Sequence, residues 1–510
     1  MTRPVLATLL ALALLLPMTV PSTAQAGPGQ VSIMMDDDNL LYRGDQVRDQ
    51  TLQRMRTLGV DVVRVTVLWS VVAEKTTRRG MRGARAADPR NYPRLNWDRY
   101  DRLVRAARSL GIGVYFNPTY PGPPWAHGKA PRGLRSVVKR AWKPKSGEFA
   151  KFVEALGRRF SGRYRDENDA RALIPRVSMW GIGNEPNQAG WLAPQWEKGR
   201  MVSPKQYREL YLRARAALDR TGHGRDTILV GELAPLGSSL RNPTSPVRPR
   251  RFLKALLCDS GRGGAGCDAF DKYGPIRATG FAHHPYTKNV SPLTKDSHPD
   301  SITMANLSSL SRLLDQQASK TRNITRGLPL WLTEFGFETN PPDPFSGIPL
   351  ERQAEWNQLG ELLAYLDPRV MGLTQFLLRD VAPVASAPRT SKARWFTYQS
   401  GLEFANGQPK PAHQAYYFPF VVQQPGRYVA NVWGQLRFRP NGLPAGAQDQ
   451  IQLQFRPADR STDFLDVGEP ILVTSSMNYF TGRVQLPGPG EIRARWTDGP
   501  FASRPAAVTR

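Results

Sequence analysis

Two glutamates, each placed directly after an apolar run, are the residues of this sequence best suited to chemistry. Glu185 follows the run 177–183, and Glu334 follows the run 328–332. Both runs have the continuous apolar character of buried strands. Two carboxylates at the carboxyl ends of two interior strands are what double-displacement hydrolysis of a glycosidic bond requires, because one protonates the leaving oxygen while the other attacks the sugar carbon.

The elements that must position these glutamates alternate regularly through the first four-fifths of the chain. Eight apolar runs predict strands, and several are apolar throughout, as in parallel strands covered on both faces. Amphipathic segments between them predict helices, so the fold class is α/β and a (β/α)8 TIM barrel is expected, with its active site at the carboxyl ends of the strands. A doubly wound open sheet is the alternative, but no Gly-x-Gly-x-x-Gly follows the first strand. The predicted strands are 31–35, 61–68, 111–117, 177–185, 227–232, 278–286, 328–334 and 371–378, and the predicted helices are 46–58, 98–110, 147–159, 204–220, 249–257, 302–317 and 350–366.

The pattern changes near residue 420 to short alternating strands separated by turn residues. This pattern predicts a small antiparallel β-sandwich with strands at 428–432, 450–455, 470–474, 479–486 and 491–496. We therefore expect the barrel to occupy 27–420 and the sandwich 421–510. The sandwich contains no evident catalytic cluster. It could bind carbohydrate or pack against the barrel, and core packing is the expected role of Trp433, Tyr479 and Trp496.

The first 26 residues have the features of a cleaved secretion signal. Arg3 supplies the positive end, the run 5–16 the apolar core, and Ala26 ends a small-residue cleavage site. The apolar run is too short for a membrane span. The mature protein is expected to begin near Gly27, outside the cytoplasm, and a retained amino-terminal anchor is the alternative.

The only two cysteines, Cys258 and Cys267, enclose a glycine-rich segment. In an exported protein this spacing predicts one disulfide that acts as a structural staple. A metal site would need more ligands than two thiols.

The formal net charge is +27, which could attract nucleic acid, anionic cell-wall polymer or acidic polysaccharide. The arginines are scattered rather than clustered with aromatic residues, so solvated surface charge is an equally good interpretation. We predict no nucleic-acid partner and at most a weak attraction to anionic cell-surface polymer.

Three motifs lie on the predicted fourth, sixth and seventh strands: Trp180-Gly181-Ile182-Gly183-Asn184-Glu185-Pro186, His284-Pro285-Tyr286 and Leu332-Thr333-Glu334-Phe335-Gly336. In this order they resemble the retaining glycoside hydrolases of clan A, most nearly the cellulase-like family 5, with family 39 close behind. The resemblance covers residues 31–417. It implies a barrel of eight βα units, hydrolysis with retention, and no metal or organic cofactor.

The resemblance implies that Glu185 is the acid/base, Glu334 the nucleophile, and Tyr286 a hydrogen-bond donor to the nucleophile. Arg64 is a cation in an apolar strand and must reach a carboxylate, since an unpaired buried charge is prohibitively costly. A matching arginine in family 5 supports the nucleophile, and we assign Arg64 that role; a purely structural ion pair is the rival interpretation. His284 shares a strand face with Tyr286, whereas His283 points to the opposite face.

Three further residues are expected to contact the sugar. Asn184 has an amide suited to the sugar 2-hydroxyl, although it could be an ordinary strand-end turn residue. Asn117 ends the third strand and Trp69 the second, and an aromatic ring there could stack on a sugar or pack in the core.

The sequence departs from family 5 at the end of the eighth strand, which lacks the expected tryptophan, so Gln375 or Phe376 must substitute for it. Asp36, Asp37 and Asp38 follow the first strand, where they could bind sugar hydroxyls or form a solvated acidic loop. These observations predict a secreted, monomeric retaining β-glycosidase acting on a poly- or oligosaccharide. The alternative is a non-catalytic carbohydrate-binding or cell-wall protein on the same barrel.

Overall fold

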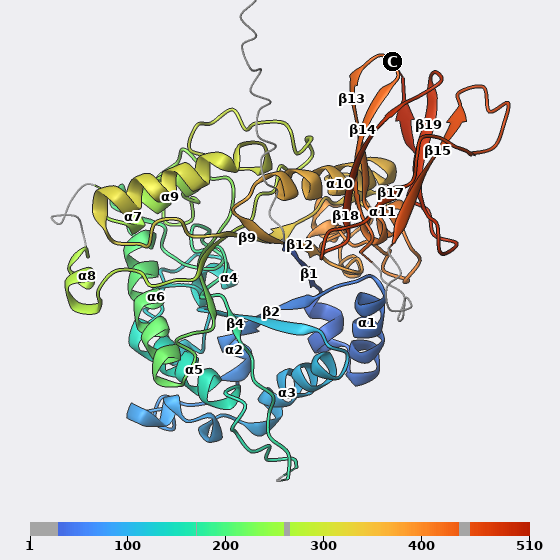
Figure 1. Ribbon diagram of the computed structural model, residues 1–510. Helices are drawn as coiled ribbons and strands as arrows, with labels where there is room; N and C mark the ends of the chain where they lie inside the picture. Colours follow the sequence, from blue (N-terminus) through green and yellow to red (C-terminus); the bar gives the residue numbers. More distant parts are fainter. Residues whose placement is uncertain (1–28, 170, 260–265, 438–448, 510) are drawn as a thin grey trace, which may run out of the picture.

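A closed barrel of eight parallel strands forms the centre of the molecule, with helices around it (Figure 1). The computed structural model describes residues 29–169, 171–259, 266–437 and 449–509. All eight predicted strands are present and neighbour one another in the order β1-β12-β9-β8-β7-β4-β3-β2, which confirms the (β/α)8 barrel. The strands are β1 Val31–Met35, β2 Val62–Leu68, β3 Gly113–Thr119, β4 Met179–Trp180, β7 Thr227–Leu233, β8 Gly280–His283, β9 Leu330–Phe335 and β12 Val370–Phe376.

The predicted helices also form, and two of them have clearly shifted boundaries: the helix expected over 98–110 begins four residues earlier, at Arg94, and the helix expected over 302–317 is displaced at both ends. The helix expected over 302–317 begins only at Ser308, because Thr303 and Asn306 cap a short 3-10 turn before it. Apolar side chains from helices and strands build one large core around the barrel. The long helices are α1 Asp45–Thr57, α3 Arg94–Ser109, α5 Ser146–Arg159, α6 Ser203–Arg220, α7 Pro249–Leu256, α9 Ser308–Thr321 and α10 Leu350–Leu366, and the short ones are α2 Trp69–Val72, α4 Ser136–Arg140, α8 Asp268–Tyr273 and α11 Pro411–Tyr417.

Two antiparallel sheets follow the barrel and face each other across a second core (Figure 1). Phe420 and Phe480 of one sheet and Ile451 and Ile492 of the other are buried in that core, which confirms the predicted sandwich. Three strands are additional to the prediction: one of seven residues at 420–426, and two short ones at 465–466 and 506–508. One sheet contains β13 Phe420–Gly426, β14 Val429–Gln435 and β18 Tyr479–Gln485, and the other contains β15 Gln450–Pro457, β16 Leu465–Asp466, β17 Ile471–Leu472, β19 Gly490–Trp496 and β20 Ala506–Val508.

The sandwich packs on α10 through aromatic and charged side chains. Trp433 and Tyr479 stack with ring centroids 5.8 Å apart and form a cluster with Leu362 of α10. Arg437 forms an ion pair with Glu361 of the same helix at 2.6 Å. The aromatic residues are therefore used for packing, as expected.

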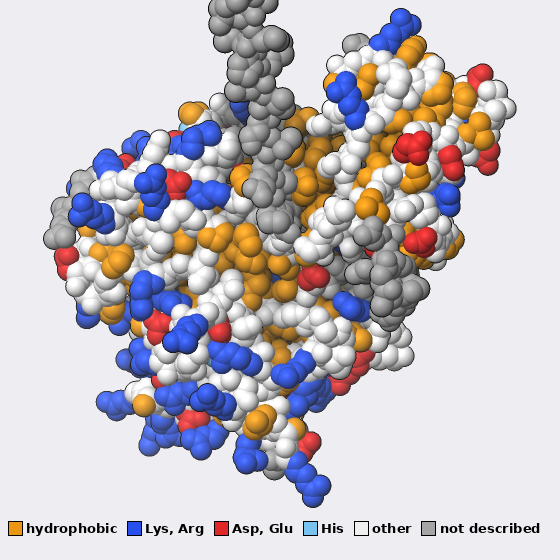
Figure 2. Space-filling model, in the orientation of Figure 1, with side chains coloured by type: hydrophobic (Ala, Val, Ile, Leu, Met, Phe, Trp, Pro, Cys, Tyr) orange, Lys and Arg blue, Asp and Glu red, His pale blue; other side chains and the backbone are white. Residues whose placement is uncertain are grey.

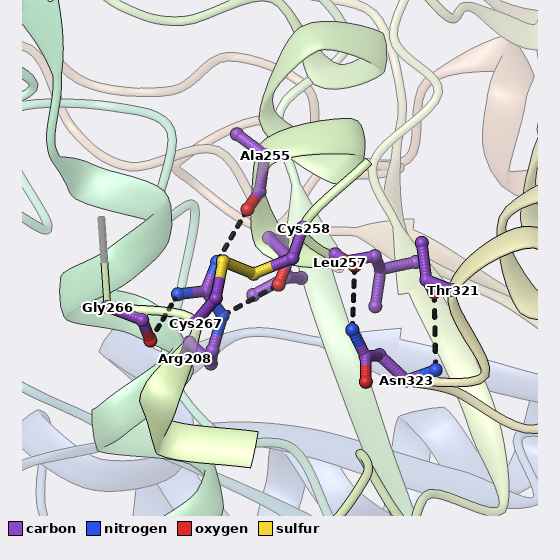
Figure 3. The surroundings of a disulfide bond; sticks show 9 residues. Arg208, Ala255, Leu257, Cys258, Gly266, Cys267, Thr321 and Asn323 are labelled. Carbon is purple, nitrogen blue, oxygen red and sulfur yellow. Dashed lines mark hydrogen bonds between the residues drawn. A yellow bond between two sulfur atoms is a disulfide. The ribbon is translucent and has the colours of Figure 1, made fainter. Parts of the chain in front are cut away.

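The predicted disulfide joins Cys258 and Cys267, whose Cα atoms lie 6.1 Å apart (Figure 3). Arg208 of α6 donates hydrogen bonds to the carbonyl oxygens of Leu256 at 2.8 Å and Gly266 at 2.9 Å, so it ties both sides of the closed loop to the barrel. The predicted signal, residues 1–26, lies outside the described residues. In the described part of the chain, no helix is long and apolar enough to cross a membrane.

Candidate active site

A cleft of about 1000 Å³ opens at the carboxyl ends of the barrel strands. Its walls come from segments that follow strands all around the barrel, including Asp37 after β1, Tyr286 after β8 and Phe376 at the end of β12. Both Glu185 and Glu334 line it. The two glutamates predicted from separate motifs therefore share one cavity.

Glu185 and Glu334 approach closely at the floor of the cleft. One carboxylate oxygen of each, together with a ring nitrogen of His284, forms a group whose members all lie within 4.8 Å of one another. The Glu185 side chain is 20% exposed and the Glu334 side chain 9% exposed. Glu185 is thus the more accessible of the two.

Two donors hold the Glu334 carboxylate from below. Arg64 donates from Nη1 to Oε1 at 3.0 Å, and the Tyr286 hydroxyl donates to Oε2 at 3.2 Å. Burial raises the pKa of Glu334, while His284 and Arg64 oppose that rise. The roles expected of Arg64 and Tyr286 therefore have the required geometry.

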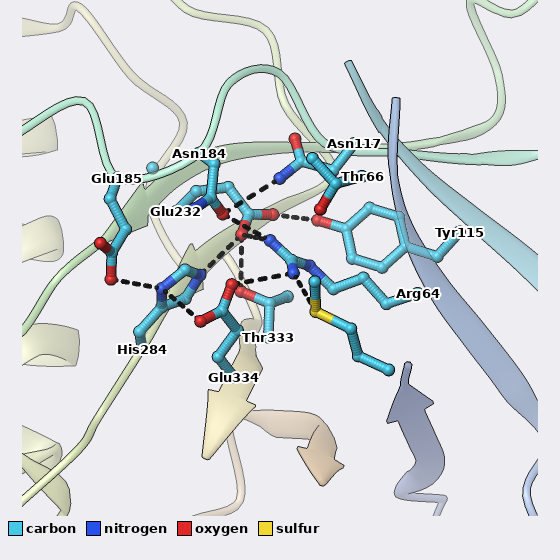
Figure 4. A network of polar contacts seen from close by, with 12 residues as sticks. Arg64, Thr66, Tyr115, Asn117, Asn184, Glu185, Glu232, His284, Thr333 and Glu334 are labelled. Carbon is cyan, nitrogen blue, oxygen red and sulfur yellow. Dashed lines mark hydrogen bonds and ion pairs between the residues drawn. The ribbon is translucent and has the colours of Figure 1, made fainter. Parts of the chain in front are cut away.

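A third carboxylate, Glu232 at the end of β7, lies behind the other two and is fully buried (Figure 4). It accepts hydrogen bonds from Tyr115, from Arg64 Nη2 at 2.9 Å, from Thr333 Oγ1 at 2.9 Å and from His284 at 2.9 Å. Burial alone would raise the pKa of this carboxyl group, but Arg64 and His284 outweigh burial and hold the pKa at about 2.

Glu232 is not among the predicted site residues. The available signal was the same as for the other two glutamates, namely a carboxylate that ends an apolar strand predicted to be interior. Glu185 and Glu334 each lie in a motif that resembles a known glycoside hydrolase motif, whereas Gly231-Glu232-Leu233 does not.

His284 joins the three carboxylates (Figure 4). Its Nδ1 lies 3.0 Å from Glu185 Oε1 and 3.5 Å from Glu334 Oε2, and its Nε2 lies 2.9 Å from Glu232 Oε2. Burial alone would lower the pKa of the imidazole, but the surrounding carboxylates outweigh it and raise the pKa to about 9. Both ring nitrogens thus face carboxylate oxygens, which favours the charged form of the imidazole.

The adjacent His283 points away from the site, as the strand alternation predicts. Its Nε2 lies 2.9 Å from the carbonyl oxygen of Ile302, and burial lowers its pKa to about 3. Only one histidine of the pair thus faces the carboxylates.

Asn184 and Asn117 occupy different levels of the site. Asn184 lines the cleft and accepts a hydrogen bond from Arg64 Nη2 at 2.8 Å, which leaves its amide NH₂ group for another partner. Asn117 is fully buried, and its amide lies 2.8 Å from Arg64 Nη2 (Figure 4). The expectation that Asn117 contacts the sugar is wrong, because this side chain braces the arginine below the cleft.

The expectation that Trp69 stacks on a sugar is also wrong. The chain turns into α2 at Trp69, so the indole is fully buried and stacks on Phe152 of α5 with ring centroids 5.7 Å apart. The aromatic residues that do line the cleft include Trp191 and Tyr398, of which Tyr398 is 55% exposed. These were not among the predicted site residues.

The end of β12 supplies an aromatic wall without a tryptophan. Phe376 lines the cleft, and its ring centroid lies 5.1 Å from that of Tyr398. Gln375 is buried instead and donates to the carbonyl oxygen of Ser400 at 3.1 Å. Of the two residues expected to replace the tryptophan, Phe376 is therefore the one that lines the cleft.

The acidic segment after β1 is not a solvated loop. Asp36 is fully buried and accepts a hydrogen bond from the amide of Arg379 at 3.1 Å, while Asp37 accepts from the amide of Thr66 at 3.2 Å and lines the cleft. Burial raises the pKa of Asp36 to about 6 and that of Asp37 to about 7. The segment therefore forms part of the wall of the cleft.

Glycines in the first motif make room for this arrangement. A Cβ atom on Gly181 would lie 2.6 Å from the Tyr115 hydroxyl and 2.8 Å from Glu232 Oε1. Gly183 has φ +83° and faces the ring of Tyr120. Glu185 itself has φ +37°, and its amide donates to the carbonyl oxygen of Glu232 at 3.0 Å. A strained backbone held by neighbouring contacts is typical of functional sites.

The group Glu185, His284 and Glu334 could in principle bind a metal ion, but the state of the histidine argues against it. An imidazole binds metal only through an unprotonated nitrogen. Both nitrogens of His284 already lie within hydrogen-bond distance of carboxylate oxygens, at 3.0 Å from Glu185 Oε1 and 2.9 Å from Glu232 Oε2. We therefore assign no metal to this site.

No protein-family model and no curated protein matches this chain. Among solved structures, a glucosidase from Croceicoccus marinus is similar over 91% of this chain and 94% of its own, with 14% identity and a TM-score of 0.50. A family 39 glycoside hydrolase from Bacteroides cellulosilyticus WH2 matches over 91% and 80%, with 13% identity and a TM-score of 0.46. GH5_18 from Streptomyces cattleya matches over 77% and 79%, with 17% identity and a TM-score of 0.48. The three solved structures named here are glycoside hydrolases, and the strand order and the likeness to the glucosidase establish the (β/α)8 barrel fold.

Proposed function

We propose that this protein is a secreted retaining β-glycosidase that cleaves O-glycosyl bonds in a poly- or oligosaccharide. One observation carries the proposal: an oxygen of Glu185 and an oxygen of Glu334 lie within 4.8 Å of each other in a cleft at the carboxyl ends of the strands. Retaining enzymes hold their carboxyl groups about 5–5.5 Å apart, whereas inverting enzymes leave about 6.5–9.5 Å for a water molecule. The short separation supports retention.

In the first step Glu334 attacks the anomeric carbon, and the bond from that carbon to the leaving oxygen breaks as Glu185 transfers its proton to that oxygen. In the second step Glu185 removes a proton from water, and the water oxygen displaces Glu334 from the anomeric carbon. Arg64 and Tyr286 orient Glu334 through the hydrogen bonds described above. The free NH₂ group of Asn184 is placed to donate to the sugar, where a contact to the 2-hydroxyl would strengthen in the transition state.

The charge of the cleft supports a neutral or amino-bearing sugar rather than an acidic one. Although the chain carries a formal net charge of +27, the charged side chains lining the cleft are acidic with one exception. Lysine and arginine side chains are instead spread widely over the outer face of the barrel (Figure 2). Any attraction to anionic polymer would therefore act at the outer surface and weaken with salt. The charged lining residues are Asp37, Asp38, Glu185, Lys288, Glu334 and Glu338.

Secretion is supported by the disulfide, since such bonds persist in oxidising compartments. The predicted signal itself lies in the undescribed amino-terminal segment.

The test begins with the purified protein and a panel of aryl β-glycosides, soluble glucans and mannans. We expect hydrolysis by the wild type, loss of about 10²–10⁴ in kcat for Glu185→Gln on substrates with poor leaving groups, and no measurable turnover for Glu334→Gln. Proton NMR of the first-formed product should show the anomer of the substrate. Tight glycan binding without turnover would favour the non-catalytic alternative, and an inverted product would refute double displacement.

A further inference from the structure

We propose that Glu232 is a positioning residue that keeps His284 protonated on both nitrogens, so that the Nδ1–H group serves whichever of Glu185 and Glu334 carries the negative charge. The inference rests on the function proposed above, because it concerns how the two carboxylates exchange charge. Glu232 does not line the cleft and is fully buried, so it acts through His284 and not on the substrate.

The geometry fixes Glu232 as a permanent anion. Its two oxygens receive donors from three strands: Arg64 of β2, Tyr115 of β3 and Thr333 of β9. With these contacts in place, the remaining strong donor is His284 Nε2 at 2.9 Å. A carboxylate that accepts this many hydrogen bonds stays ionised over the whole working range of an enzyme.

His284 is surrounded by carboxylates whose roles differ. Glu185, from the segment after β4, and Glu334, from β9, change charge during catalysis, whereas Glu232 of β7 keeps its charge throughout. The nearby cation Arg64 bonds to Glu232 and Glu334, the neighbouring His283 is neutral, and Tyr286 donates to Glu334. Glu232 is thus the one partner able to hold the imidazole protonated in every step.

The Nδ1–H group of the protonated His284 lies near both reacting carboxylates and can interact with either of them. Nδ1 has a single proton. In this structure it lies within hydrogen-bond distance of Glu185 Oε1 at 3.0 Å, and Glu334 Oε2 is farther away at 3.5 Å, so a small rotation of the ring or carboxylate would bring the N–H group to Glu334. Before the first step Glu334 is ionised and Glu185 protonated. After it Glu334 is an ester and Glu185 is ionised, because its proton has gone to the leaving oxygen. The negative charge has moved across His284, and the N–H group can follow it without giving up its proton.

The charges balance in both states. Arg64 and His284 are positive, and Glu232 is negative, in each. One further negative charge belongs to Glu334 in the free enzyme and to Glu185 in the covalent intermediate. The buried cluster is therefore neutral at both stages, so the first step moves charge within the site without creating a net charge in a low-dielectric interior.

The direct test is ¹⁵N NMR of the full-length protein labelled at histidine, which has only six histidines to assign. In the wild type, His284 should show the imidazolium pattern on both nitrogens at neutral pH. A neutral single tautomer of His284 at neutral pH would overturn the proposal without any variant being needed.

Glu232→Gln removes the charge and preserves the shape of the side chain. The pKa of His284, measured from its NMR titration, should fall by about one to three pH units. In the pH profile of kcat, the alkaline limb should shift to lower pH by the same amount, because a neutral imidazole can no longer donate from Nδ1. KM should stay near the wild-type value. A folded variant in which neither the titration nor the limb moves would contradict the proposal.

Thr333→Val is the matched control, since it removes a neutral donor to the same Glu232 oxygen and leaves the carboxylate charge in place. The titration of His284 should then stay close to that of the wild type. The NMR readout needs no substrate. A wild type that fails to hydrolyse glycosides would therefore refute the proposed function, whereas an uncharged His284 would refute this inference alone.

Discussion

Arg64 is the side chain on which the buried charges of the site depend, and its replacement by methionine has a large expected cost. The guanidinium is fully buried and donates to Glu232 at 2.9 Å, Glu334 at 3.0 Å and Asn184 at 2.8 Å. Methionine fills a similar volume but leaves two buried carboxylates without their cation. Breaking a buried ion pair by removing one partner costs about 3–5 kcal/mol. We expect the free energy of unfolding to fall by that amount.

A second replacement separates charge from packing. In the double variant Arg64→Met/Glu232→Gln the more deeply buried of the two carboxylates has lost its charge as well, so Glu334 alone is left without the arginine. Removing a whole buried pair is often close to neutral. The double variant should therefore recover at least about half of the loss, or ~2 kcal/mol. The cycle of single and double variants gives the coupling energy directly.

The assay is urea unfolding followed by tryptophan fluorescence, with Arg158→Met as the control. Arg158 pairs with Glu154 at 2.6 Å on the surface of α5, and its side chain is 50% exposed. Exposed pairs of this kind contribute about 0–1 kcal/mol. Equal losses for Arg64→Met and Arg158→Met would refute the reasoning. So would a double variant whose loss is the full sum of its two single losses.

Three further predictions concern stability and packing. The pKa of Glu232 is lowered from 4.5 to about 2, so this residue contributes stability that is present above pH 4.5 and lost as the pH falls toward 2. The pKa of His284 is raised from 6.5 to about 9, so this residue contributes stability that is present below pH 6.5 and lost as the pH rises toward 9. The Tm difference between the wild type and Glu232→Gln should therefore be greatest between pH 4.5 and 6.5, and a difference independent of pH would contradict this linkage. Cys258→Ser opens a disulfide with a sequence separation of 9 and should cost about 2–3 kcal/mol in urea unfolding, whereas an unchanged midpoint would show that the bond does not constrain the unfolded chain. Gly181→Ala places a Cβ atom 2.8 Å from Glu232 Oε1 and should reduce kcat by disturbing the buried carboxylate, and wild-type kinetics would show that the strand can shift to admit the methyl group.

The barrel could be predicted because its strands are buried on both faces and are therefore apolar throughout, and because turn and helix signals separate them. That Glu185 and Glu334 share one cleft could be predicted because each ends such a strand within a familiar motif. Trp69 could not be placed correctly from the sequence, because whether the chain continues as a loop or turns into α2 decides whether the ring faces the cleft or the core.

Glu232 shows the other limit of the sequence. The role proposed for it depends on four donors that arrive from β2, β3, β9 and the segment after β8, none of them near it in the chain. The same limit applies to Asn117. Its position at a strand end could be predicted, but barrel packing decides that it lies buried against Arg64 and not at the cleft surface.

The most direct test of double displacement is to trap the glycosyl-enzyme with a panel of 2-deoxy-2-fluoro glycosides and to map the modified peptide by mass spectrometry. We expect one added glycosyl group per molecule, on the peptide containing Glu334, and none in Glu334→Gln. A stable label on any other residue would contradict the assignment of Glu334 as the nucleophile.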